Sequence, residues 1–88
     1  MDLKSAIFDA FGMKKKVLEE LGMRIREKRK ACGLTQEELA SLAEIDRSYM
    51  GGVERGERNL TFSVLCQISN ALNSDVAGLT VGLPESIK

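Results

Sequence analysis

The chain lacks histidine and tryptophan and has only two cysteines among its 88 residues. Without histidine it lacks the side chain that most often acts as a general base near neutral pH. Neither a nucleophile motif nor a glycine-rich phosphate loop takes its place. Cys32 and Cys66 form no CxxC pair and have no histidine with which to share a metal ion. The sequence therefore predicts no enzymatic activity, no cofactor and no metal site.

Features of strands and of membrane segments are also scarce. Aromatic residues make up 5% of the chain, there is one proline, and β-branched residues do not alternate with polar ones; together these favour helices over strands. Asp9 interrupts the apolar stretch between residues 6 and 11, so we expect neither a signal peptide nor a membrane span, and a cytoplasmic location. Cys32 and Cys66 fall among helical apolar positions and are expected to be small buried thiols.

Charge of neither sign is in excess, because 13 basic residues balance 13 acidic ones. The distribution is uneven, however, since residues 13–30 contain eight basic and three acidic side chains, a local net charge of +5. Such a segment is either a basic face that contacts phosphate or a solvated helix flank. The composition leaves both interpretations open.

Apolar residues spaced three and four apart predict a helix from about 14 to 31, which Gly33 would end. Thr35 and Glu38 have the spacing of a capping box at the start of a second helix. Three further helices are expected: one between Asp46 and Gly56, one over 61–72, and a short one through Val76 and Leu79 that Ser74 or Asp75 caps. The predicted fold class is all-α, a compact five-helix domain over residues 14–80.

The two ends of the chain fall outside this domain. Residues 1–13 form an N-terminal extension with apolar residues at helical spacing, Leu3, Ile7, Phe8 and Phe11. They predict either an extra short helix, which ends near Gly12 and packs on the domain or on a partner subunit, or a mobile extension. Residues 81–88 are expected to form a frayed C-terminal tail.

The twenty residues from 36 to 55, QEELASLAEIDRSYMGGVER, carry the most specific pattern. Leu39 to Ala43 spans one helical turn and Met50 to Val53 another, whereas Ala43 and Ile45 break the helical register between them. Two short helices joined by a tight turn, each with an apolar side toward a shared core, are typical of a helix-turn-helix. In that motif the second helix projects into the major groove of DNA.

Two segments resemble the Cro/repressor-like helix-turn-helix family, also called the xenobiotic-response-element family. They are LGMRIREKRKACGLTQEELASLAEI over residues 21–45 and DRSYMGGVERGERNLT over 46–61. The second segment is particularly similar to the controller proteins of restriction–modification systems. The resemblance implies a lambda-repressor-like domain that binds a palindromic operator in double-stranded DNA as a homodimer and regulates transcription. It implies no membrane partner and no small-molecule substrate.

The resemblance also assigns roles by position. Base edges would be read from the third helix by Arg47, Ser48 and Gly52, with Tyr49 beside them. Phosphate would be held by Thr35, Gln36, Arg55 and Arg58. Arg29 and Glu54 match a family ion pair between the first and third helices. The expected dimer interface comes from the fifth helix and its end, with Val76, Leu79 and Val81.

Several assignments have an alternative. Arg47 either contacts guanine or pairs with Asp46, Glu44 or a phosphate, and Gly52 either admits a base edge or, like Gly51, makes room for a bulky neighbour. The dimer residues either face a partner or close the monomer core.

Glu44 stands where the family commonly has glycine, and a left-handed backbone there would cost about 1–2 kcal/mol. The turn would either accept that cost or be wound differently. The rival function is a helix-turn-helix module that binds protein, or an antitoxin that captures a partner protein through the N-terminal segment.

Overall fold

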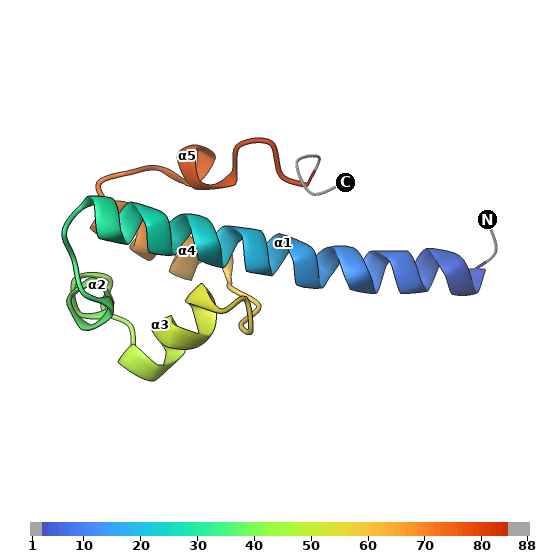
Figure 1. The fold of residues 1–88 in the computed structure, drawn as a ribbon, viewed down its shortest axis with the longest axis horizontal. Helices are drawn as coiled ribbons and strands as arrows, with labels where there is room; N and C mark the ends of the chain where they lie inside the picture. The colour runs from blue at the N-terminus through green and yellow to red at the C-terminus, as the bar shows by residue number, and fades with distance from the viewer. Residues whose placement is uncertain (1–2, 85–88) are drawn as a thin grey trace.

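The computed structural model describes residues 3–84, and for residues 3–11 it describes the backbone alone. Within this range all regular structure is helical, in the order α1 (Leu3–Ala31), α2 (Gln36–Leu42), α3 (Arg47–Glu54), α4 (Phe62–Ala71) and α5 (Val76–Thr80) (Figure 1). The predicted all-α, five-helix domain is confirmed. No helix in the described range is long and apolar enough to cross a membrane.

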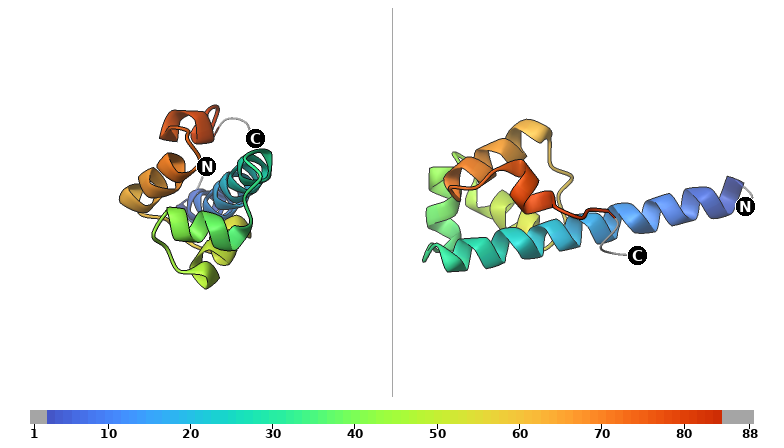
Figure 2. Two further views of the ribbon diagram at one scale, coloured as in Figure 1. Left: turned by 90° about the vertical axis from the view of Figure 1, so that its left-hand side faces the viewer. Right: turned by 90° about the horizontal axis from the view of Figure 1, so that it is seen from above.

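The first helix is longer than the sequence predicts. α1 runs unbroken through Gly12 for 29 residues, so the expected helix end near this glycine is wrong. A single interior glycine costs only about 1 kcal/mol, which good helix formers on both sides offset. The C-terminal half of α1 lies against the other helices, whereas its N-terminal half projects away from them (Figures 1 and 2).

The predicted caps are present. The backbone N–H of Glu38 donates to Thr35 Oγ1 at 3.1 Å, and Thr35 N–H donates to Glu38 Oε1 at 2.8 Å, which completes the capping box of α2. Asp46 caps α3 and accepts from the Tyr49 N–H at 3.2 Å, while Asp75 caps α5. These side chains satisfy N–H groups that a helix start otherwise leaves without a partner.

The turn between α2 and α3 keeps the conformation that usually requires glycine. Glu44 has φ 58°, in the left-handed region, so the chain accepts the expected cost of about 1–2 kcal/mol. The Ile45 N–H donates to Ala40 O at 2.9 Å, and Gln67 Nε2 donates to Ala43 O at 3.0 Å. These bonds tie the turn to α2 and to α4.

The core lies where the C-terminal half of α1 meets α2 to α5. It consists of Leu21, Ile25, Leu39, Ala40, Ala43, Met50, Val53, Ile68, Leu72 and Leu79. Met50 and Val53 anchor one side of α3 in this core, whereas its first two residues, Arg47 and Ser48, are exposed to solvent.

The predicted burial of the two cysteines is wrong for Cys32 and only partly met by Cys66. Cys32 is exposed, because it lies in the turn after α1 rather than on the helix face that points to the core. Cys66 is half-buried, and both thiols are free.

Candidate nucleic-acid interface

The exposed face of α3 begins at its N-terminus. Arg47 and Ser48, the first two residues of the helix, are both exposed, while Met50 directly after Tyr49 is fully buried. Arg47 forms no ion pair with Glu44 or Asp46, although all three lie within the described part of the chain. Its guanidinium therefore remains available to a partner outside the chain.

Gly51 and Gly52 are covered by arginines that follow α3. A Cβ at Gly51 would lie 3.1 Å from Arg55 Nη1, and a Cβ at Gly52 would lie 3.0 Å from Arg58 Cγ and Nε. Both glycines are buried. This agrees with the interpretation that they make room for bulky neighbouring side chains. Gly52 is thus not open to a base edge in this structure, because the stem of Arg58 lies on it.

Tyr49 lies at the edge of the same face. Its ring is half-buried, and the Arg58 guanidinium carbon lies 5.5 Å from the ring centroid. A cation placed over an aromatic face at this distance is attracted by the ring quadrupole. Tyr49 therefore holds Arg58 in place beside α3.

An ion pair and a hydrogen bond join α1, α2 and α3 behind the exposed face. Arg29 Nε donates to Glu54 Oε2 at 2.8 Å and Arg29 Nη2 to Oε1 at 3.1 Å, a bidentate pair. The side chains are 11% and 4% exposed. Gln36 Nε2 also donates to Glu54 Oε1, at 3.2 Å. Three donors on one buried carboxylate fix the C-terminal end of α3 relative to α1 and α2.

The residues assigned to phosphate lie at two places in the structure. Thr35 and Gln36 lie at the start of α2, where the Thr35 hydroxyl is engaged in the cap and Gln36 is engaged with Glu54. Arg55 lies at the end of α3, where its Nε donates to Glu57 Oε2 at 2.9 Å in an exposed pair. That hydrogen bond lowers the pKa of the Glu57 carboxyl below its ordinary value and raises the pKa of Arg55.

Sequence reasoning missed Gly22. A Cβ at this position in α1 would lie 2.5 Å from the Val53 carbonyl oxygen and 2.6 Å from that of Glu54. The backbone of α1 therefore approaches the end of α3 so closely that only glycine fits. Gly56 makes a similar approach, since its Cβ would lie 2.6 Å from Glu19 Cα. The sequence does contain a sign of the contact at Gly22, because a glycine beside the apolar residues of a predicted helix often marks a close approach of another segment.

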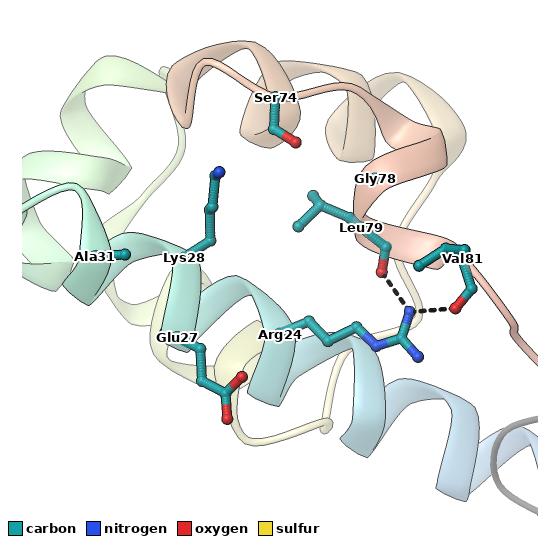
Figure 3. Close-up of a pocket in the computed structure, with 8 residues that line it drawn as sticks. All are labelled: Arg24, Glu27, Lys28, Ala31, Ser74, Gly78, Leu79 and Val81. Atoms are coloured by element: carbon teal, nitrogen blue, oxygen red, sulfur yellow. Dashed lines mark hydrogen bonds between the residues drawn. The ribbon is translucent and has the colours of Figure 1, made fainter.

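The three residues predicted for the dimer interface differ in their exposure to solvent. Leu79 is 3% exposed and belongs to the core, so its assignment to a dimer surface is corrected. Val76 is half-buried, and Val81 is 69% exposed. Arg24 Nη1 donates to the carbonyl oxygens of Leu79 and Val81 at 3.1 and 2.7 Å (Figure 3). These bonds hold the end of α5 against α1.

Beside these bonds lies an open groove of about 440 Å³ between α1 and α5. Lys28 and Ser74 line it from opposite sides (Figure 3). Residues 81–84 form turns beyond α5, and the rest of the predicted tail, 85–88, lies outside the described residues.

Residues 25–79, from the C-terminal end of α1 to α5, match a family model described as helix-turn-helix. The chain belongs to the helix-turn-helix family. In this family the two helices of the motif correspond here to α2 and α3, joined by the turn at Glu44. The matched segment leaves out the part of α1 before Ile25.

Named relatives of this helix-turn-helix chain include regulators of restriction–modification systems. The control protein C.SmaI of Serratia marcescens is 41% identical over 63 residues, which are 72% of this chain and 75% of that protein. The crystal structure of the controller protein C.AhdI from Aeromonas hydrophila is 47% identical with a TM-score of 0.69, over 70% of this chain and 94% of that one. The immunity repressor of Bacillus phage phi105 is 37% identical over 59 residues, 67% of this chain and 41% of the repressor.

Proposed function

We propose that this DNA-binding transcriptional regulator acts in the cytoplasm as a homodimer on a palindromic operator, as the controller of a restriction–modification system. α3 would lie in the major groove, with Arg47 and Ser48 toward base edges. Arg55, Gln36 and the start of α2 would contact the phosphates on either side of the groove.

The observation that carries this proposal is the exposure of Arg47 at the first turn of a helix whose opposite side is locked in the core. An arginine so placed can donate two hydrogen bonds to O6 and N7 of a guanine. The buried Glu54 carboxylate supports the geometry, because it fixes α3 against two other helices. The controller function is supported by the similarity to C.SmaI and C.AhdI.

The homodimer is supported by the small size of the reading surface. One helix of eight residues reads only a few base pairs, and a twofold axis doubles that number while it matches the symmetry of a palindrome. Val81, exposed at the end of α5, and the half-buried Val76 are the parts of the expected interface that remain accessible.

The test compares two exposed arginines at opposite ends of α3. The operator is first selected from a random duplex pool, and affinities are then measured for it and for all its single base-pair variants. Arg47→Ala should abolish the preference at one base pair. Arg55→Ala should weaken all duplexes alike and reduce the slope of log affinity against log salt by about 1. If the unaltered chain binds no duplex at low salt, the function is that of a protein-binding module instead.

A further inference from the structure

We propose that Arg58, in the loop after α3, reads a base in the major groove and so determines operator specificity. The inference rests on the proposed function above. It replaces the phosphate contact that the sequence predicts for this residue. The side chain of Arg58 lies along α3 rather than away from it.

The stem of Arg58 occupies the space that a side chain at position 52 would fill. A Cβ built at Gly52 would meet Arg58 Cγ and Nε at 3.0 Å and Cδ at 3.5 Å. Gly52 has no side chain, and the stem of Arg58 from the loop lies in that space instead. Any larger residue at 52 would push the stem of Arg58 aside.

The guanidinium end is held as well. Its carbon lies 5.5 Å from the centroid of the Tyr49 ring, and Tyr49 and Gly52 are neighbours on α3 because they are three residues apart. The stem on Gly52 and the cation on Tyr49 are two independent contacts. Together they reduce the rotamer freedom that a surface arginine would otherwise lose when it binds.

The place where Arg58 is held lies on the reading face. Ser48 and Gly52 are four residues apart and so lie on one side of α3, opposite the buried Met50 and Val53. Arg58 thus lies one helical turn further along α3 than Ser48. A guanidinium there can donate a bidentate pair to guanine, as Arg47 can from the first turn.

The two loop arginines differ in their partners. Arg55 is bound to the Glu57 carboxylate, whereas Arg58 donates no hydrogen bond to any residue of the described chain. Arg58 therefore keeps its N–H donors for a ligand. Together with its position over Gly52 and Tyr49, this difference points to base reading by Arg58.

The test uses the full chain and the operator variants described above. Arg58→Ala should lower affinity for the preferred operator roughly five- to hundred-fold and abolish the preference at one base pair. Gly52→Ala, which leaves the charge of Arg58 in place, should reduce the preference at that same base pair. Tyr49→Leu should do so too, whereas Tyr49→Phe keeps the ring and should have no such effect.

The matched control is Gly51→Ala, whose Cβ would meet the flexible end of Arg55 and should leave that base pair unaffected. Thermal unfolding checks that every variant folds. A uniform loss of affinity for all duplexes in Arg58→Ala, with a lower salt slope, would show a phosphate contact and overturn the inference. So would an unchanged base preference in Gly52→Ala. Either result leaves the proposed function intact, because the unaltered chain and Arg47→Ala test that separately.

Discussion

At the scale of single residues, three glycines decide how closely parts of the chain approach α3. Gly22 admits the carbonyl groups that end α3, Gly51 admits Arg55, and Gly52 admits Arg58. A Cβ at Gly22 would clash with backbone atoms. A Cβ at Gly51 or Gly52 would first meet a flexible arginine side chain. The consequences of substitution therefore differ, although the chemical change is the same.

Gly22→Ala and Gly12→Ala form a matched pair within α1. At Gly22 the new methyl group would lie 2.5 Å from the Val53 carbonyl oxygen, so we expect a loss of about 1–3 kcal/mol of stability, typical of overpacking. At Gly12 nothing lies within 4 Å, and alanine should instead stabilise the helix by about 0.8–1 kcal/mol. Urea unfolding of both variants checks the prediction. Equal effects would contradict the close approach of α1 and α3.

At the scale of helices, α3 is positioned by polar contacts as well as by the core. Arg29 in α1 and Gln36 in α2 both donate to Glu54, so one carboxylate joins three helices. Local caps define where these helices begin, and the capping box of α2 is the most complete.

The Arg29–Glu54 pair should contribute far more to stability than the Arg55–Glu57 pair. Their shortest distances are nearly equal, 2.8 and 2.9 Å, but the first pair is 11% and 4% exposed and the second 62% and 57%. Glu54→Ala leaves the charge of Arg29 buried without a counter-charge, with only the Leu34 carbonyl oxygen still accepting from its Nη1, and should cost about 3–5 kcal/mol. Double-mutant cycles on both pairs, measured by chemical unfolding, should show coupling in the first only. The absence of coupling between Arg29 and Glu54 would remove the proposed support of α3.

The capping box should make stability depend on pH in the acid range. Hydrogen bonds from the Thr35 backbone and hydroxyl lower the pKa of the Glu38 carboxyl below its ordinary 4.5. Because the folded pKa is the lower one, the stabilisation is present above pH 4.5 and is lost as pH falls through the folded value. Glu38→Gln should flatten the fall in stability between about pH 5 and 3, as thermal unfolding at several pH values would show. The matched control is Glu37→Gln, which removes a carboxylate from the same helical turn but leaves the capping box intact.

At the scale of the whole molecule, a compact body carries one reading helix and a projecting half of α1 (Figure 2). Net charge is zero, so attraction to DNA depends on where the basic side chains lie. Six of the eight basic residues in 13–30 are exposed along α1, whereas Arg24 and Arg29 are bound within the fold. A single body of this size offers too small a reading surface for a long operator.

The spacing of half-sites tests the homodimer. Two reading helices related by a twofold axis contact half-sites about 10–10.5 base pairs apart, on one face of the duplex. Insertion of about five base pairs turns the second half-site to the opposite face, so affinity should fall to that of a single half-site. Fluorescence anisotropy on labelled duplexes, with sedimentation to determine the stoichiometry, measures this. Equal affinity for the single half-site and the palindrome would show that the chain acts as a monomer.

Prediction from the sequence succeeded where structure depends on near neighbours. The capping box, the cap at Asp46 and the helix ends at Gly33 and Gly56 are set by residues within three or four positions of one another. Prediction failed for the length of α1, because the cost of one glycine is small and depends on the whole helix. It also failed for Cys32, whose exposure depends on where the turn after α1 lies relative to α4.

The sequence by itself determined the number of helices in the domain, their caps, the core face of α3 and the family of the chain, because apolar periodicity and capping are local properties. Only the tertiary structure decided that Leu79 closes the core, that Gly22 touches the end of α3 and that Arg58 lies across Gly52. Some of these contacts join residues far apart in the chain. In the contact between Arg58 and Gly52, a loop lies back against the helix that precedes it. Their distances follow from the packing of all five helices, which no local pattern of residues contains.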